Sequence, residues 1–381
     1  MLRITRGEES KLTSWYFEID KRLLYLVLIL VLIGAVAAFS AGAANAYKLG
    51  KPWFHFVSRS LCFYSAGGLI LFICSMLNKK QIIRLSVLGL LVGIFGLLVT
   101  LTNSSSLNSS DRWANIAGIS FMPAEILKPS FIILTAWFLE KMHSVYGDNI
   151  FSKETLRFNK FSWWPYLILF GLCVGIIFQH PDFGMALLYV GVLGVMLFVA
   201  RMPWKLILGL GGGAIAVLSV IALTFMKHVQ GRAGQMFHLV PRSQVWFSVN
   251  AIRHGGLFGS GDKSFVQDQL AESVNDFVYA SIAEYAGALG ACALVVVLFL
   301  VLNNLIKHAI SSKDEFVMYV LAGTAALFGG QICFNLMTAL HLFINKGMTL
   351  PFVSYGGWAI LTMCALFGMV LALIREDTWN R

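Results

Sequence analysis

The residues of this sequence whose types and positions could do chemistry are ionisable side chains inside or beside long apolar segments. A charge at membrane depth costs on the order of 3 kcal/mol or more, so such a residue is kept where it pairs with another charge or lines a polar cavity. The chemistry open to these residues is therefore ion pairing or contact with a polar substrate. They are Arg59, Glu125, Lys128, Asp182, Asp276 and Glu284.

Three of these residues, Glu125, Lys128 and Asp276, have a purely structural interpretation beside the functional one. Glu125 and Lys128 are three residues apart, which places them on one helix face, where an ion pair could fix helix packing. Asp276 ends a long loop at the expected start of a helix, where the helix dipole favours a carboxylate. Asn275 and Asp276 could also serve there as an N-cap.

The elements that must position these residues are membrane-spanning helices. Of the 381 residues, 58% are hydrophobic and 13% are charged, against about half and about a quarter in ordinary soluble domains. Apolar runs of about 20 residues recur along the chain, and each can span a bilayer as a helix. They lack the alternation of transmembrane barrel strands. The composition excludes an ordinary soluble enzyme and predicts an all-α polytopic membrane protein.

Ten apolar windows predict ten transmembrane helices with one long extracytoplasmic loop at 227–275. With the N-terminus inside, eighteen of the 29 basic residues fall in cytoplasmic segments, so the positive-inside rule places both termini in the cytoplasm. We expect a cytoplasmic segment at 1–22, a membrane domain at 23–374 and a cytoplasmic C-terminus at 375–381. The length of the first run favours a span over a cleavable signal peptide. The ten windows are residues 23–42, 54–77, 83–102, 124–140, 163–179, 184–200, 204–226, 276–304, 315–340 and 352–374.

The two long outer segments, 103–123 and 227–275, contain basic residues that the positive-inside rule disfavours there. A guanidinium fork suits diphosphate oxygens, although any one of these charges could also be a solvated loop residue. Glycines in the second segment allow tight turns or close approach of a ligand. Apolar residues in the same segment predict that it packs on the bundle or partly re-enters it. The basic residues are Arg112, Arg232, Arg242, Arg253 and Lys263, and the glycines are Gly255, Gly256, Gly259 and Gly261.

Several other chemistries are disfavoured. The net charge of +10 comes from basic residues scattered between the spans, whereas nucleic-acid binding needs them in one patch. The six cysteines all lie inside apolar runs without a CxxC pair, so disulfides and thiolate metal sites are not expected. No two outer histidines have metal-ligand spacing on one helix, and the sequence contains no Gly-x-Ser-x-Gly or Walker pattern.

Four separated segments resemble the motifs of one family, the SEDS proteins (shape, elongation, division and sporulation). Their order and spacing and the ten spans all agree, so the resemblance covers nearly the whole chain. The closing segment, KGMTLPFVSYGG at 346–357, is the most specific of the four. The others are Arg112-Trp113 with MPAEILK at 122–128, HPDFG at 180–184, and NAIRHGGLFG at 250–259 with LAESVNDF at 270–277.

Two further segments resemble the division branch of this family more than its elongation branch. They are FHFVSR at 54–59, and His341-Leu342 before the closing segment. The chain departs from the family pattern mainly at polar neighbours of the charged motif residues, while the charged residues are retained. These departures include Met122, Ala124, Ala271 and Val274.

The resemblance implies a peptidoglycan glycosyltransferase. Members of the family polymerise lipid II, an undecaprenyl-diphosphate-linked disaccharide pentapeptide, into glycan strands at the outer face of the inner membrane. By the resemblance, Asp276 is the general base that takes the proton from the attacking sugar 4-hydroxyl. The residues expected to bind the diphosphate and the sugars are Arg112, Arg242, Arg253, Lys346 and Ser354. Those expected to support the site are Arg59, Glu125, Lys128, Asp182 and Glu284.

The resemblance also implies partners at the division septum of the bacterial inner membrane. We expect a class B penicillin-binding protein transpeptidase and other membrane proteins of the division machinery, with lipid II and the nascent glycan strand as substrates and no nucleic acid. A divalent cation, Mg²⁺ or Mn²⁺, is left open, although no dedicated ligand set is visible. The rival functions are a noncatalytic division scaffold and a lipid II flippase, whose charges should lie at the membrane midplane beside broken helices.

Overall fold

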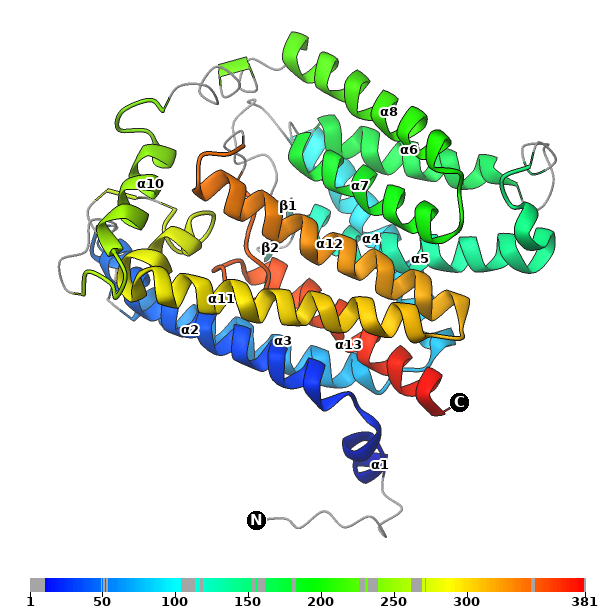
Figure 1. Cartoon of the computed structure of the whole chain (residues 1–381), viewed down its shortest axis with the longest axis horizontal. Coiled ribbons are helices and arrows are strands. Elements are labelled where there is room, and N and C mark those ends of the chain that lie inside the picture. Colours follow the sequence, from blue (N-terminus) through cyan, green and yellow to red (C-terminus); the bar gives the residue numbers. More distant parts are fainter. Residues whose placement is uncertain are drawn as a thin grey trace.

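The computed structural model describes most of the chain, as a bundle of helices (Figure 1). The described residues are 11–48, 50, 52, 54–103, 114–116, 119–152, 155, 162–179, 183–225, 230–231, 239–261, 269–270, 272–343 and 347–379. Each of the ten apolar windows coincides with one helix, so the prediction of ten helices is confirmed. They are α2 (Lys21–Lys48), α3 (His55–Ser75), α4 (Lys79–Asn103), α5 (Pro123–Tyr146), α6 (Trp163–Gln179), α7 (Phe183–Val199), α8 (Trp204–Phe225), α11 (Val278–Ser311), α12 (Glu315–Ala339) and α13 (Gly357–Trp379).

The lengths and composition of these helices make the chain a multi-pass membrane protein. Within the described residues, seven helices are long and apolar enough to cross a membrane, namely α2, α3, α4, α8, α11, α12 and α13. Helices α6 and α7 are equally apolar but have 17 residues each. Helix α5 is less apolar because Glu125 and Lys128 lie near its start and Glu140 and Lys141 near its end.

Shorter elements occupy the connections. In the first long outer segment, β1 (Ala114–Ile116) pairs antiparallel with β2 (Ile119–Phe121), with Ala114 opposite Phe121. The second contains α10 (Gln244–Gly255). Helix α1 (Lys11–Glu18) precedes α2, and a short 3-10 helix, Gly147–Asn149, follows α5. None of these elements has a long apolar run, which is why hydropathy did not reveal them.

The last helix begins later than predicted. Helix α13 starts at Gly357 and not at residue 352, and α11 starts at Val278 and continues to Ser311. Residues 347–356 instead form a loop, because their backbone and side chains hydrogen-bond to the turn before α11. The apolar run therefore predicted the span correctly but placed its start five residues too early.

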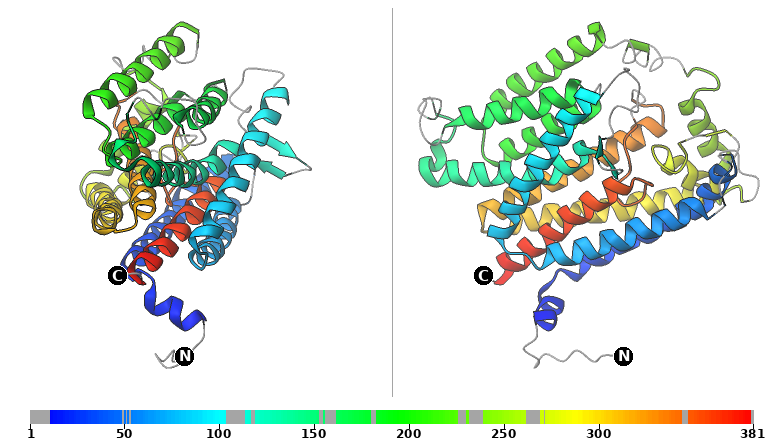
Figure 2. Two further views of the ribbon diagram at one scale, coloured as in Figure 1. Left: turned by 90° about the vertical axis from the view of Figure 1, so that its right-hand side faces the viewer. Right: turned by 180° about the vertical axis from the view of Figure 1, so that it is seen from behind.

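Helices α2, α3, α11, α12 and α13 lie side by side, and α5 and α7 pack on α12 to join α4, α6 and α8 to this group (Figures 1 and 2). Helices α12 and α13 are central, with 67% and 72% of their apolar windows buried. Helix α8 is at the edge, with 0% of its window buried, and its main neighbour is α7. The exposed apolar surface of α8 is suited to lipid.

Close packing of α4 on α5 fixes the helix that contains Glu125 and Lys128. A Cβ atom at Gly93 would collide with the Leu127 side chain, and one at Gly96 would collide with Pro123. Small residues at such contacts let two helix backbones approach closely in a membrane. The glycines of α4 therefore set the position of the first two turns of α5.

Helix α10 packs against α11 and α12 at the end of the bundle far from the C-terminus (Figure 1). The Ser248 hydroxyl donates to the Ala339 carbonyl over 2.9 Å, and Val245 and Ala251 are buried against Phe277 and Ala280. The prediction that the long outer loop packs on the bundle is confirmed for the described part of that loop.

Candidate active site

Asp276 lies in a turn directly before α11. The backbone amides of Asn275 and Phe277 both donate to the Glu272 carbonyl, over 3.1 and 3.2 Å, and these two bonds form the turn. The N-cap of α11 is Phe277, which makes no side-chain capping bond, and the Asn275 amide group donates instead to Glu272 Oε2 over 2.8 Å. The N-cap interpretation of Asn275 and Asp276 is therefore wrong, and Asp276 has a half-buried carboxylate beside the loop 347–356.

The loop 347–356 covers the Asp276 turn and is bonded to it. The Ser354 hydroxyl donates to the Asn275 carbonyl over 2.6 Å, and the Tyr355 amide donates to the Val274 carbonyl over 2.8 Å. Ser354 Oγ also accepts from the Leu350 amide over 2.8 Å. Because the Ser354 side chain is buried and makes both bonds to the main chain, it joins the two segments beneath the site surface.

Gly347 lies against the Asp276 carboxylate. A Cβ atom built on Gly347 would overlap Asp276 Oδ2 and approach the carboxyl carbon at 2.9 Å. Only glycine leaves room for the carboxylate in this position, so the second residue of the closing segment is adapted to Asp276. Lys346, which precedes it, lies outside the described residues.

Asn335 of α12 holds both sides of this contact. Its side-chain amide donates to the Asp276 carbonyl over 2.9 Å and to the Met348 carbonyl over 2.7 Å. The side chain is almost fully buried, where a hydrogen bond is little weakened by competing water. One neutral side chain thus ties the Asp276 turn and the closing loop to a central helix.

The backbone of the closing loop is strained near this contact. Phe352 has a φ of 63°, a left-handed conformation that is rare for a bulky residue. Its ring is buried and meets the Phe367 ring edge-on at 4.9 Å, and its carbonyl accepts from the Tyr64 hydroxyl over 3.2 Å. Such strain persists only where the surroundings over-determine it, and it is concentrated at functional sites.

Glu284 joins α10 and the segment after it to α11. Its side chain is completely buried and Oε1 lies 3.0 Å from His254 Nδ1. Its carbonyl accepts from the amide and the hydroxyl of Ser260, over 2.9 and 3.1 Å. Helix α11 has a non-helical residue at Gly287, with φ 69°, which allows these contacts.

The glycine-rich segment after Arg253 makes backbone contacts with α11. Cβ atoms at Gly255 and Gly259 would overlap the carbonyls of Ala283 and Tyr285, and the Ala288 amide donates to the Gly256 carbonyl over 2.8 Å. Of the two interpretations of these glycines, the structure supports tight turns, because Gly256, Gly259 and Gly261 have positive φ, and it adds close backbone packing on α11.

Glu125 and Lys128 form the predicted ion pair. Lys128 Nζ lies 2.6 and 2.7 Å from the two carboxylate oxygens, and the two side chains are only 6% and 1% exposed. No contact found among the described residues joins this pair to Asp276. Its chemistry is therefore that of a buried ion pair that would be costly to break.

The basic candidates lie around the end of the bundle that contains Asp276, which the sequence predicts to face outward and which we call the outer end. Arg242 precedes α10 and Arg253 lies in its last turn, and both are exposed. Arg59 is exposed one turn after Phe56, whose ring meets that of Tyr355 edge-on at 5.3 Å, so Arg59 is near the closing loop. In the part of the chain that the structure describes, none of the three forms an ion pair. Arg112 and Asp182 lie outside the described residues.

Three residues of the site were missed in the sequence. Asn335 is a polar residue inside an apolar run, a signal that a search confined to ionisable residues passed over. Gly347 was seen only as part of a motif. His254 is one of the outer histidines without metal-ligand spacing, and nothing in its sequence position points to Glu284, 30 residues away.

One protein family and several of its named members match this sequence along nearly its whole length. The model of the cell cycle proteins FTSW_RODA_SPOVE matches residues 20–378. The chain is 30% identical over 380 residues to the "Probable peptidoglycan glycosyltransferase FtsW" of Caulobacter vibrioides, covering 97% of this chain and 93% of that protein. It is 28% identical over 381 residues to the protein of the same name from Coxiella burnetii, covering 97% and 99%.

Solved structures share the fold. A chain from a peptidoglycan synthase complex, whose structure is described as showing coordination of polymerization and crosslinking, matches with a TM-score of 0.74 and 23% identity over 94% of this chain and 98% of that chain. The rod shape determining protein RodA of Thermus thermophilus matches with a TM-score of 0.67 and 21% identity over 94% and 97%.

Proposed function

The chain belongs to the FTSW_RODA_SPOVE family of cell cycle proteins, and on this premise we propose that it polymerises lipid II into glycan strands during septal cell wall synthesis. The relatives are named probable peptidoglycan glycosyltransferase FtsW, in agreement with the division branch indicated by the sequence. The observation that carries the proposal is Asp276, a carboxylate at the outer end of the bundle whose main chain is fixed by Asn335 and Ser354.

The proposed reaction joins the 4-hydroxyl of one sugar to the anomeric carbon of another. The new C–O bond forms as the bond from that carbon to the diphosphate breaks, and undecaprenyl diphosphate leaves. The hydroxyl proton passes to the Asp276 carboxylate, which acts as general base. Displacement at an α-linked carbon gives a β-linkage, an inversion that one carboxylate base can serve without a covalent intermediate.

Negative charge develops on the leaving diphosphate and needs cationic stabilisation. Arg242 and Arg253 are exposed at the outer end, where a guanidinium fork can bind phosphate oxygens. We assign the same task to Arg112 and Lys346. In the described ranges no group of three or more His, Cys, Asp or Glu side chains could hold a metal ion. No step above uses a divalent cation.

The environment we propose is the bacterial inner membrane at the division septum, with both termini cytoplasmic. The exposed Arg84 and Lys141 lie at the inner ends of α4 and α5, as the positive-inside rule requires. The partner we propose is a class B penicillin-binding protein transpeptidase, together with other division proteins. A matching solved chain comes from a peptidoglycan synthase complex, which supports a partner of this kind.

The decisive experiment measures glycan chains made from lipid II by the purified protein, alone and with its transpeptidase. Asp276→Asn keeps the shape of the side chain and removes the base, and we expect chain synthesis to fall by about 10²- to 10⁴-fold. Glu272→Gln is the matched control, because it removes an exposed carboxylate from the same turn.

Equal chain synthesis by both variants and the wild type would refute the catalytic assignment. If the wild type makes no chains and labelled lipid II crosses a liposome bilayer, the flippase alternative is correct. If the wild type does neither, and a variant with Asp276 replaced still supports division, the protein is a scaffold.

A further inference from the structure

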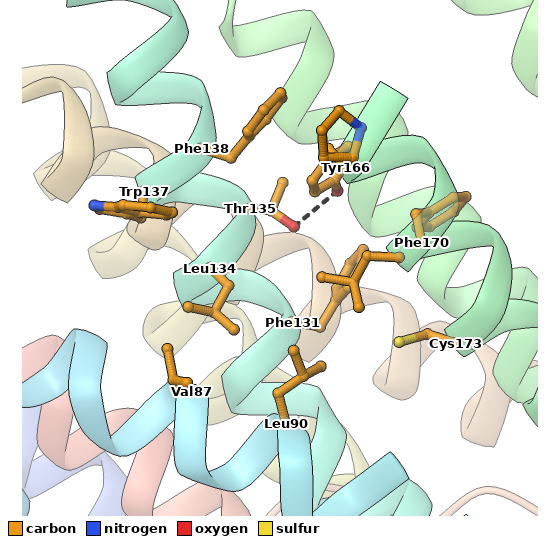
Figure 3. Close-up of a pocket in the computed structure, with 12 residues that line it drawn as sticks. Val87, Leu90, Phe131, Leu134, Thr135, Trp137, Phe138, Tyr166, Phe170 and Cys173 are labelled. Atoms are coloured by element: carbon orange, nitrogen blue, oxygen red, sulfur yellow. Dashed lines mark hydrogen bonds between the residues drawn. The ribbon is translucent and has the colours of Figure 1, made fainter. Parts of the chain in front are cut away.

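A cavity of about 280 Å³ lies between α4, α5 and α6 (Figure 3). Its lining is apolar and largely aromatic, and the hydroxyls of Thr135 and Tyr166 bond to each other over 2.9 Å across α5 and α6. One of these hydroxyls donates to the other, and the rest of the cavity surface is almost entirely apolar, so the cavity favours an apolar ligand. The lining residues are Val87, Leu90, Phe131, Leu134, Thr135, Trp137, Phe138, Pro165, Tyr166, Leu169, Phe170 and Cys173.

The cavity is open toward the surrounding membrane. Val87 and Trp137 line it and are 43% and 38% exposed, so its wall continues into the outer surface of the bundle. At this depth a bilayer contains hydrocarbon and no water. An apolar cavity stays dry and accepts apolar ligands, so a hydrocarbon chain is the occupant that its chemistry favours. A helix, about 10 Å across, is too wide for this volume.

The cavity extends from the part of its helices nearest their inner ends to just past their middle. Val87 and Leu90 are 8 and 11 residues from the start of α4, or about 12 to 17 Å along the helix axis. Trp137 lies nine residues before the end of α5, and Tyr166 three residues after the start of α6. Asp276 is at the opposite end of the bundle, so this cavity is separate from the candidate active site.

Two basic side chains flank the cavity on its inner side. Arg84 precedes Val87 by three residues on α4, and Lys141 follows Phe138 by three residues on α5, so each lies one turn from the lining. Both are exposed, and neither pairs with an acidic side chain of the described residues. Exposed basic residues at this level attract anionic lipid headgroups.

We propose that this cavity binds one acyl chain of an anionic glycerophospholipid of the inner leaflet, with its phosphate between Arg84 and Lys141. The chain fills the space between α4 and α6, which make few direct contacts with each other. The polyprenyl chain of the substrate is disfavoured, because its diphosphate belongs at the outer end. The lipid thereby joins α6 to the α4–α5 pair.

Tryptophan fluorescence tests this directly. The full-length protein is reconstituted in phosphatidylcholine vesicles that contain increasing amounts of phosphatidylglycerol with a brominated acyl chain, which quenches nearby tryptophans. Subtracting the signal of Trp137→Phe isolates Trp137 in the cavity wall. Trp164→Phe isolates the control, since Trp164 is also 38% exposed but is not part of the lining.

We expect quenching of Trp137 to saturate at a lower fraction of phosphatidylglycerol than quenching of Trp164, and unlabelled phosphatidylglycerol to reverse it. Val87→Phe narrows the cavity and should raise the half-saturating fraction about tenfold or more. Val92→Phe, at a position 41% exposed on the same helix and outside the cavity, should not. Arg84→Gln and Lys141→Gln should each raise it about fivefold.

Three results would overturn the proposal. The first is equal, unsaturable quenching of Trp137 and Trp164, which indicates boundary lipid only. The second is equal quenching by brominated phosphatidylcholine. The third is reversal by undecaprenyl phosphate at lower fractions than by phosphatidylglycerol, which assigns the cavity to a polyprenyl chain. Thermal unfolding of each variant confirms that it is folded before its quenching is compared.

Discussion

Two regions at opposite ends of the bundle, the Asp276 turn at the outer end and the Lys79 cluster at the inner end, are held together by different kinds of interaction. At the outer end, the neutral side chains of Asn335 and Ser354 donate to main-chain carbonyls around Asp276. At the inner end, charged side chains bond to each other, and Lys79 Nζ lies 2.9 Å from both Glu140 Oε1 and Asp314 Oδ2. Buried neutral bonds do not titrate and are not screened by salt, whereas partly exposed ion pairs weaken in salt. The geometry of the Asp276 turn is therefore fixed, whereas the strength of the ion pairs around Lys79 depends on salt concentration.

The largest effect should follow from Gly347→Ala at the outer end. The added methyl group would overlap the Asp276 carboxylate and displace it. A misplacement of about 1 Å at a catalytic group can cost about 100-fold in rate, so we expect kcat for glycan synthesis to fall by about that factor or more. Gly356→Ala in the same loop is the control, because its methyl would meet the methyl groups of Thr349 and Ala359 at 3.1 and 3.2 Å and would not approach Asp276. If Gly347→Ala kept a kcat near that of the wild type, the Asp276 carboxylate would not need a fixed position, and the proposed contrast between the two regions would be wrong.

A smaller effect is expected from Asn335→Leu, which preserves volume and removes both donated bonds. Leaving the buried carbonyls of Asp276 and Met348 unpaired should destabilise the protein by about 1 to 3 kcal/mol. We also expect kcat to fall about tenfold to 100-fold with KM for lipid II unchanged, because Asn335 positions Asp276 and is buried away from substrate.

The matched control is Asn304→Leu on α11. Asn304 is similarly buried, and in both residues the side-chain Oδ1 has no partner among the described residues, but Asn335 also donates two bonds at the site. Replacement of Asn304 should leave kcat unchanged. If both leucine variants lose stability equally and neither changes kcat, Asn335 has only a structural role.

This contrast also shows what the sequence could predict. Ten helices were predictable because each apolar run of about 20 residues has one stable form in a bilayer, and the Glu125–Lys128 pair was predictable because its spacing is local. The bonds from Asn335 to residues 59 and 13 positions away could not be read from spacing. The start of α13 was missed because the closing loop is as apolar as a helix, and only its bonds to the Asp276 turn exclude a helical backbone there.

At the inner end, Lys79→Met should have a modest effect on stability. It leaves Glu140 and Asp314 without their shared cation, but all three side chains are partly exposed, so we expect a loss of about 1 kcal/mol. Thermal unfolding at low and high salt tests this, because the difference from wild type should shrink as salt screens the pair. Lys80→Met removes an exposed neighbouring lysine and should change nothing. A salt-independent loss would contradict the distinction between the ends.

The smallest effect concerns the pH dependence of the inner end. Burial raises the pKa of Asp20, but hydrogen bonds from His308 and the Leu23 amide outweigh it, and the net pKa lies below the ordinary value of 3.8. A carboxylate with a lowered pKa in the folded state stabilises the protein above pH about 4, and this contribution disappears as pH falls through the folded pKa.

Asp20→Asn should therefore cost less than about 1 kcal/mol at neutral pH and nothing at the most acidic pH the protein tolerates. Because the Asn335 bonds at the outer end have no titratable partner, the Asn335→Leu loss should stay constant over the same range, and a parallel decline of both losses would remove the difference between the two ends.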